Sequence, residues 1–240
     1  MNKIKILSFL KSWILPPELF RILVNFKKKE IYQLAAYLEK LLDFENGYYV
    51  ELGANNGINF ANTLALEKKK NWKGVLIEPA LNNFLELLKN RSNENHFDCC
   101  ACVPFDFKNE TLTLFYGDQM SVGENSQNFH DDYKKKATDS LKISENTPDF
   151  EQQIKFAAVA KPITTVLDDA KAPPKIDFLS LDVEGAELEV LKGLDFSKYT
   201  FDWMAIESAK ISEIQDYLSP FGYVLHDQVS HHDYIFKKTA

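Results

Sequence analysis

Long apolar runs are scarce in this chain of 240 residues. The apolar stretch near the N-terminus is interrupted by Lys5, Lys11 and Pro16-Pro17, so it is too short and too charged to span a bilayer as a helix. It also lacks a small-residue cleavage site, which argues against a secretory signal peptide. The overall composition, with 45% hydrophobic and 26% charged residues, is that of a soluble protein able to bury a full core.

Cysteine is rare, and excess positive charge is absent. The three cysteines, Cys99, Cys100 and Cys102, lie within four residues. On a strand, Cys100 and Cys102 would share one face and Cys99 the other, so we predict buried reduced thiols rather than a disulfide or a metal site. A cytoplasmic location fits this usage. The net charge of −7 argues against a nucleic-acid partner that binds through bulk charge.

Positive charge is instead concentrated in residues 1–29, which carry seven Lys and Arg against one acidic residue, Glu18. Apolar residues that include Phe9 and Trp13 lie between these charges. The segment is either a helical cap packed on the domain or on a second subunit of a homo-oligomer, or an amphipathic peripheral contact with an anionic membrane surface. We favour a basic, amphipathic helical cap over residues 1–45, followed by a single domain over residues 46–240.

The glycine pattern G-x-G-x-x-G of dinucleotide-binding enzymes is missing. Residues 50–57 instead read Val-Glu-Leu-Gly-Ala-Asn-Asn-Gly, which predicts a strand ending in Glu51, a glycine-bearing turn and a following helix. A second strand over residues 74–77 ends in Glu78-Pro79, at the distance of about 20 residues where Rossmann-type folds hold ribose hydroxyls. This arrangement favours S-adenosylmethionine (SAM) over NAD as the ligand.

The remaining pattern alternates strands with helices. Residues 81–90 predict a helix with Leu81, Phe84, Leu85, Leu87 and Leu88 on its buried side. The other expected strands are 97–103, 155–160, 176–182 and 203–207, with hairpins at 105–107/111–115 and 222–226/233–237. The other expected helices are 59–70, 164–170 (capped by Thr164 or Thr165) and 211–218, and residues 117–155 form an insertion or lid. Together they predict a Rossmann-like α/β fold with a mostly parallel seven-stranded sheet and a C-terminal antiparallel hairpin.

Three segments carry a family resemblance. Residues 50–57, 76–79 (Leu-Ile-Glu-Pro) and 176–187 (Ile-Asp-Phe-Leu-Ser-Leu-Asp-Val-Glu-Gly-Ala-Glu) resemble the signature blocks of FkbM-type SAM-dependent methyltransferases. The resemblance implies a class I methyltransferase fold and O-methylation. The cofactor-binding residues that it implies are Glu51, Gly53, Ala54, Asn55, Gly57, Glu78, Pro79 and Asp182. Asn56 departs from the pattern, since many relatives have Asp there, which leaves that contact open.

Two strand-end acids are the candidate catalytic residues. Asp182 and Glu207 end strands that should be neighbours, as do the acids that bind magnesium in catechol-type O-methyltransferases. They are therefore Mg²⁺ ligands, or a base or substrate ligand, or structural caps of the next helix. Glu187 lies in a first helical turn, where the dipole favours acids without any catalytic role. His232, beside Asp233, is a further candidate base or an exposed loop residue.

These observations predict a SAM-dependent O-methyltransferase acting on a hydroxyl of a sugar, glycan or glycan precursor, at the cytoplasmic side of a membrane and without a nucleic-acid partner. Methylation of a small secondary metabolite and a non-catalytic SAM-binding partner subunit are the alternatives. The clustered strand-end acids favour an active enzyme.

Overall fold

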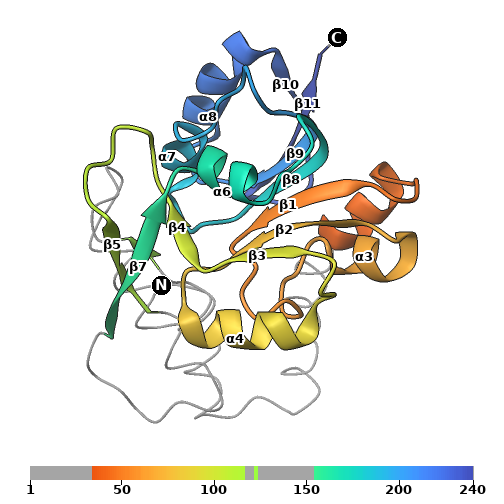
Figure 1. The fold of residues 1–240 in the computed structure, drawn as a ribbon. Helices are drawn as coiled ribbons and strands as arrows, with labels where there is room; N and C mark the ends of the chain where they lie inside the picture. Colours follow the sequence, from red (N-terminus) through yellow and green to blue (C-terminus); the bar gives the residue numbers. More distant parts are fainter. Residues whose placement is uncertain (1–33, 117–121, 124–153, 240) are drawn as a thin grey trace, which may run out of the picture.

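The computed structural model describes residues 34–116, 122–123 and 154–239 (Figure 1). The larger sheet contains β1 (Tyr48–Leu52), β2 (Lys73–Ile77), β3 (His96–Asp98), β8 (Lys175–Leu181), β9 (Thr200–Glu207), β10 (Tyr223–Gln228) and β11 (Asp233–Lys238). A smaller sheet contains β4 (Cys100–Cys102), β5 (Thr111–Phe115), β6 (Val122–Gly123) and β7 (Lys155–Lys161). The helices are a first one at 34–41, then α3 (Leu64–Lys70), α4 (Leu81–Asn90), α6 (Ile163–Asp169), α7 (Glu187–Leu191), α8 (Ile211–Leu218) and the 3-10 turn η1 (Ser219–Phe221).

The larger sheet has the order β10-β11-β9-β8-β1-β2-β3. Strands β1, β2, β3, β8 and β9 run parallel, and β11 is antiparallel to both β9 and β10. The prediction of a mostly parallel seven-stranded sheet with a C-terminal antiparallel hairpin is therefore confirmed. The chain builds outward from β1 to β3 and returns on the other side of β1 at β8. In open α/β sheets this switch point is where ligands bind, at the carboxyl ends of the strands.

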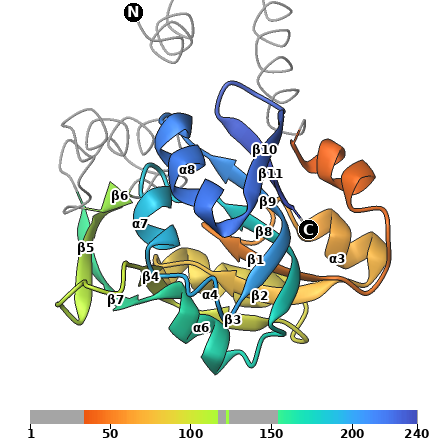
Figure 2. The same ribbon diagram turned by 90° about the horizontal axis from the view of Figure 1, so that it is seen from above.

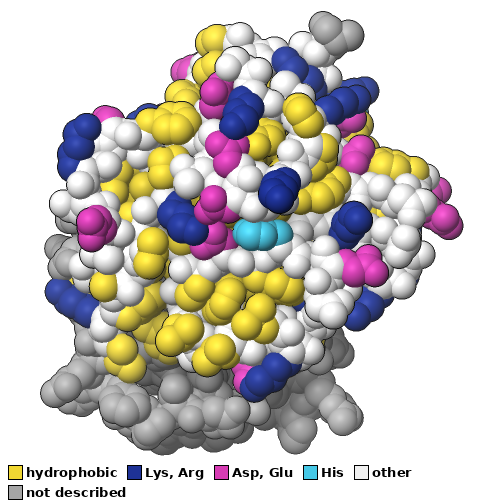
Figure 3. Space-filling view, viewed as in Figure 1, with side chains coloured by type: hydrophobic (Ala, Val, Ile, Leu, Met, Phe, Trp, Pro, Cys, Tyr) yellow, Lys and Arg dark blue, Asp and Glu magenta, His cyan; other side chains and the backbone are white. Residues whose placement is uncertain are grey.

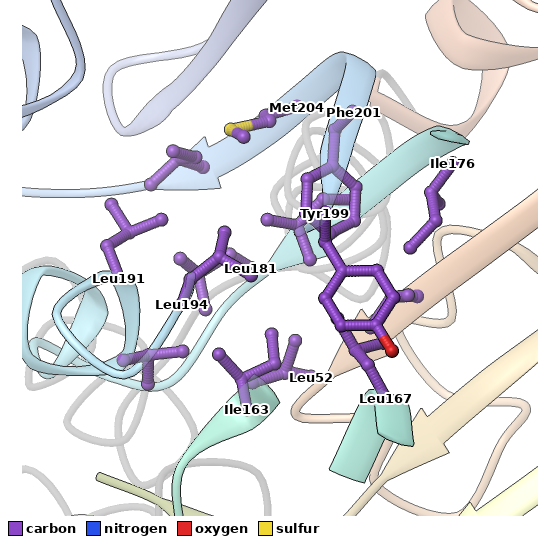
Figure 4. Close-up of a cluster of buried hydrophobic side chains, with 14 of the residues drawn as sticks. Leu52, Ile163, Leu167, Ile176, Leu181, Leu191, Leu194, Tyr199, Phe201 and Met204 are labelled. Carbon is purple, nitrogen blue, oxygen red and sulfur yellow. The ribbon is translucent and has the colours of Figure 1, made fainter. Parts of the chain in front are cut away.

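One face of the larger sheet is covered by α6, α7 and α8 (Figure 2). Its core is shown in Figure 4, where Leu52 and Leu181 of the sheet lie with Ile163 of α6 and Leu191 of α7. The apolar run of β8 supplies Leu179 and Leu181 to this face and Phe178 to the opposite one, as expected of a strand buried on both sides. Each such side chain contributes about 1.5–3 kcal/mol by its burial.

The opposite face is covered by α3, α4 and the helix at 34–41 (Figures 1 and 2). Leu34 and Leu38 are buried against the sheet residues Tyr49 and Phe178. This part of the predicted N-terminal cap is thus a helix packed on the domain. Residues 1–33 lie outside the described residues, so membrane contact through residues 1–29 stays a prediction. No helix in the described ranges is long and apolar enough to cross a membrane.

Two predicted strand segments differ from the structure. The strand expected over residues 97–103 is divided into β3 and β4, which belong to different sheets. The segment 105–107 forms a turn, closed by the Phe107 amide donating to the Pro104 carbonyl at 3.1 Å, rather than a hairpin with β5. β5 pairs with β6 and β7 instead. The three cysteines form no disulfide within the described residues, and Cys100 is buried as predicted, whereas Cys99 and Cys102 are half-buried. Of the predicted insertion, residues 117–121 and 124–153 lie outside the described residues.

The buried side of α4 also differs from the prediction. Leu81, Leu85 and Leu88 are exposed, and hydrophobic side chains gather over α4 on the molecular surface (Figure 3). Leu87 is buried and Phe84 is partly buried against the core, as predicted, and the polar Asn83 is buried beside them. The predicted buried side of the helix was therefore correct for Phe84 and Leu87 and wrong for Leu81, Leu85 and Leu88.

Helix starts were predicted less accurately than helix cores. The helix expected at 59–70 begins only at Leu64, because residues 53–62 form turns. The helix expected at 164–170 begins at Ile163 after Pro162. The Thr164 hydroxyl does not cap it, because it donates to the Gly193 carbonyl at 2.9 Å and accepts from the Asp195 amide at 2.8 Å.

Candidate active site

The candidate site lies at the carboxyl ends of β1, β2, β8 and β9. Leu52 at the end of β1 is in register with Ile77 of β2 and Leu181 of β8. Leu181 is in register with Ile206 of β9, so Asp182 and Glu207 follow on adjacent strands, as predicted. Four loops therefore meet at one edge of the sheet.

The loop after β1 is held against both neighbouring strands. The amides of Gly53 and Ala54 each donate to the Ile77 carbonyl at 3.1 Å. On the other side, a Cβ placed on Gly53 would lie 1.9 Å from the Asp182 carbonyl oxygen. The φ of +77° at Gly53 and at Gly57 adds a second reason for glycine at these positions. Gly53 is therefore required for the close approach of the β1 loop to the end of β8.

Glu78 ends β2 and is buried. Its carboxylate accepts the amides of Asn55 and Ala80, each at 2.9 Å, so it links the β1 loop to the start of α4. Pro79 follows it, and the Pro79 carbonyl accepts a weak hydrogen bond from the Cys99 thiol at 3.9 Å. Glu78 is thus an oriented carboxylate at the position predicted for ribose recognition.

Glu51 lies beneath the β1 loop rather than at its surface. Its buried carboxylate accepts the Asn62 amide at 2.7 Å and the Thr63 hydroxyl at 2.5 Å, and it pairs with the Arg91 guanidinium at 3.2 Å. These three contacts fold residues 53–62 back toward β1, which explains why α3 begins late. Direct contact between Glu51 and a cofactor stays a prediction.

Arg91 was missed by the sequence reasoning. It is the first residue after α4, and its side chain is fully buried. Its guanidinium also donates to Glu67 at 2.8 Å and to the Tyr49 and Thr63 hydroxyls, both at 2.8 Å. Burial alone would raise the pKa of Glu67, but Arg91 lowers it below its ordinary value. The charge of this arginine is therefore shared by two buried carboxylates.

Asp182 and Glu207 form a carboxyl pair. Burial raises the pKa of Asp182 well above its ordinary value, and the negative charges of Glu207, Glu184 and Glu187 raise it further. A hydrogen bond between the Asp182 and Glu207 side chains acts in the same direction. Two carboxyl groups can share a hydrogen bond only when one of them carries a proton, so this contact favours the protonated form of Asp182 beside a negatively charged Glu207.

Glu187 lies in a cleft between the starts of α7 and α8, beside Ser208 and Lys210. Burial raises the pKa of its carboxyl to about 7, against the opposing effect of hydrogen bonds from backbone amides that include Gly185. The sequence interpretation of Glu187 as a helix-start residue holds, since it is the first residue of α7. Its burial beside the carboxyl pair was not foreseen.

His232 is exposed in the turn that joins β10 to β11. Its backbone carbonyl accepts the Ser208 amide at 2.8 Å, which places this turn beside the end of β9. The Asp233 carboxylate accepts the Ser230 hydroxyl at 2.5 Å. No hydrogen bond joins the His232 ring to Asp233 in the described part of the chain, so a catalytic His232 stays a prediction.

Magnesium binding by Asp182 and Glu207 is not supported. Across the described ranges, no group of three or more His, Cys, Asp or Glu side chains is arranged to hold a metal ion. The two carboxyl groups instead hydrogen-bond to each other.

Comparison with known families decides the assignment. The sequence profile described as the methyltransferase FkbM domain matches residues 51–235, which is more than half of the chain. This chain belongs to the FkbM methyltransferase family. The match begins at Glu51 and ends within β11, so it includes every strand end described above. Comparison with curated proteins finds no match.

Solved structures similar to this FkbM methyltransferase are themselves methyltransferases. A candidate RNA methyltransferase from Pyrococcus horikoshii has a TM-score of 0.44 and 12% identity, covering 88% of this chain and 84% of its own. A precorrin-6y C5,15-methyltransferase from Geobacter metallireducens has a TM-score of 0.39 and 10% identity, covering 85% of each chain. Because both scores are below 0.5, the family match and the sheet order carry the assignment.

Family membership implies SAM as the methyl donor, and the residues at the strand ends fit it. SAM carries a positively charged sulfonium and ammonium, and the edge formed by Asp182, Glu184 and Glu207 is rich in carboxyl groups. The buried, oriented carboxylate of Glu78 suits the neutral hydroxyl groups of the ribose. The β1 loop lies between Glu78 and Asp182, where Gly53 and Gly57, each with a φ of +77°, allow a tight turn.

Proposed function

We propose that this FkbM methyltransferase methylates a hydroxyl group of a sugar or glycan. Gly53, Ala54, Asn55, Gly57 and Pro79 would line the cofactor, with Glu78 at the ribose. Asp182 would lie at the methionine end. When bound, SAM supplies an electrophilic methyl group on a sulfonium. The observation that carries the proposal is the Asp182–Glu207 carboxyl pair at the switch point of the sheet.

The carboxyl pair addresses the difficulty specific to an alcohol acceptor, which is its high pKa. A carboxyl group whose pKa is raised is a stronger base than an ordinary one, because it holds a proton more tightly. The negatively charged oxygen of the pair would accept the hydroxyl proton of the acceptor. Bound SAM would supply the methyl group to the acceptor oxygen and be released as the neutral thioether S-adenosylhomocysteine.

A small cleft beside Glu187 marks the side from which the acceptor could approach. It is bounded by Ser208 and Lys210 after β9 and by Leu188 of α7. Hydroxyl, ammonium and carboxyl groups next to the apolar side chains of Leu188, Ala209 and Ile214 suit a polyol with polar edges and an apolar face. The cleft lies at the same sheet edge as the carboxyl pair, so a hydroxyl of the acceptor could reach Asp182 or Glu207.

Methyl-labelled SAM would test the proposal. The purified protein is incubated with a panel of sugars and glycans, and the product is hydrolysed and analysed by mass spectrometry. An alkali-stable methyl ether is expected. Label found only on nitrogen, carbon or an alkali-labile ester would contradict O-methylation.

The double variant Asp182→Asn/Glu207→Gln supplies the matched control, because it keeps the shapes of both side chains and removes the ability of the pair to take a proton. Methyl transfer should fall by at least about 100-fold, the usual scale for a general base, while the Kd for SAM changes much less. Transfer that is unaffected in this variant would remove the carboxyl pair from the mechanism.

A further inference from the structure

We propose that Arg91, at the end of α4, is a positioning residue that holds the β1 loop in its cofactor-binding shape through Glu51. Glu51 then acts within the protein, as the point to which the loop is tied, and not as a direct ligand. The proposal rests on the SAM-binding site described above and does not depend on which acceptor is methylated.

The end of α4 holds the β1 loop at three points. The Arg91 guanidinium pairs with Glu51, which in turn accepts the Asn62 amide and the Thr63 hydroxyl at the far end of the loop. The Asn90 side-chain amide donates to the Asn56 carbonyl at 2.8 Å.

The third point is a packing contact. Gly57 packs so closely on α4 that an added Cβ would lie 2.7 Å from both the Arg91 Cγ and the Leu87 Cδ1 atoms. The aliphatic part of Arg91 therefore supports the loop from below, while its guanidinium holds the base of the loop through Glu51.

The start of the same helix holds the loop from the other side. The Glu78 carboxylate accepts both the Asn55 amide and the Ala80 amide, and Ala80 immediately precedes α4. One rigid unit, β2 with α4, therefore fixes the loop at Asn55 through Glu78 and at Asn56 and Gly57 through Asn90 and Arg91. Such preorganisation lowers the entropy that a ligand must remove on binding, so loosening it should weaken affinity without removing any direct contact.

Arginine suits this role better than lysine would. Its planar guanidinium reaches Glu51, Glu67 and Thr63 at the same time, with Nε, Nη1 and Nη2 each donating to a different group. A lysine ammonium would keep the charge but is a single point that cannot meet all three partners in this geometry. The substitution Arg91→Lys therefore separates the effect of geometry from that of charge.

Tyr49→Phe is the matched control. It removes the hydroxyl that accepts from Arg91 and donates to Glu67, and so damages the same buried network without touching Glu51 or the loop. A purely structural role of the network predicts that both variants lose stability and that neither affects the loop selectively.

The experiment measures amide hydrogen exchange of residues 53–57 and the Kd for SAM in the full-length wild type, Arg91→Lys and Tyr49→Phe. Arg91→Lys should accelerate exchange in the loop and weaken SAM binding by about tenfold or more, while Tyr49→Phe should leave both within about twofold. Equal effects in the two variants, or no loop effect in Arg91→Lys, would overturn the proposal.

Asn90→Ala keeps the test decisive if Arg91→Lys does not fold. It deletes only the hydrogen bond to the Asn56 carbonyl, and the side chain of Asn90 is partly exposed. Faster exchange at residues 55–57 with weaker SAM binding is expected, and unchanged exchange there would count against positioning by α4. Failure of the wild type to bind SAM would refute the cofactor site. The hydrogen-exchange comparison of the loop would still be interpretable, because exchange is measured without any ligand.

Discussion

Single carboxyl groups decide the chemistry available at the strand ends. Asp182 and Glu207 are brought together because β8 and β9 are parallel neighbours that end at the same level. This pairing could be predicted from the sequence, because acids at the ends of two adjacent parallel strands must lie at the same edge of the sheet. It was not sufficient for the raised pKa of Asp182, which depends first on burial and then on the charges of Glu207, Glu184 and Glu187 in the folded chain.

The carboxyl pair predicts a pH dependence of methyl transfer. A base with a raised pKa loses activity on acidification at a higher pH than an ordinary carboxylate. Glu207→Gln removes the negative charge and the carboxyl hydrogen bond that raise the pKa of Asp182. The acidic limb of the kcat profile should therefore move to lower pH in this variant. A limb that stays in place would show that another group sets it.

Glu187 predicts a pH dependence of stability. Its pKa is raised from 4.5 to about 7 in the folded protein, so the folded state holds this proton more tightly than the unfolded state does. Stability from this group is present below pH 4.5 and is lost as the pH rises through 7, by up to about 3 kcal/mol. Glu187→Gln should flatten that decline in urea unfolding measured between pH 5 and 8. A decline as steep as that of the wild type would contradict the assignment.

At the scale of elements, the β1 loop depends on backbone contacts that are absent from the sequence pattern. The family resemblance implied that Gly53 is a cofactor-binding residue. In the structure the space beside Gly53 is filled by the Asp182 carbonyl, so Gly53→Val would disrupt the contact between β1 and β8 rather than only block the cofactor.

Gly53→Ala and Gly57→Ala form a matched pair that tests this explanation. Both residues have a φ of +77°, so the backbone strain of the two alanines, about 1–2 kcal/mol, is similar. At Gly53 the new Cβ would lie 1.9 Å from a backbone oxygen, whereas at Gly57 it would lie 2.7 Å from side-chain atoms of Arg91 and Leu87, a less severe overlap. Gly53→Ala should lower the free energy of unfolding more than Gly57→Ala in urea titrations. The reverse order would contradict the proposed packing.

Helix α4 shows why the period of a helix is easier to predict than its buried side. Its leucines follow a helical spacing, and hydrophobicity favoured burying all of them. The buried side holds Leu87 together with Asn83, whose side-chain oxygen accepts from the Tyr116 hydroxyl at 3.4 Å, and the buried Arg91 follows the helix directly. Leu81, Leu85 and Leu88 are exposed. A long-range partner such as Glu51 cannot be read from the local pattern around Arg91.

At the scale of the whole molecule, the sequence predicted the larger sheet and missed the smaller one. The larger sheet follows from alternating strands and helices, whose parallel pairing is restricted by short connections. The smaller sheet joins β4 to β7 across more than 50 residues and uses strands of only two to seven residues. Such non-local pairing leaves little periodic signal, and Cys100 and Cys102 were accordingly assigned to a continuation of β3.

The central proposal for the whole molecule is that the strand ends of this FkbM methyltransferase bind SAM, with Glu78 at the ribose. Calorimetric titration of the full-length protein with SAM, in parallel with Glu78→Gln, tests it most directly. We predict saturable binding by the wild type and binding at least about tenfold weaker in the variant, because Gln has one acceptor oxygen in place of two. No binding by the wild type, or equal binding by both proteins, would contradict the account.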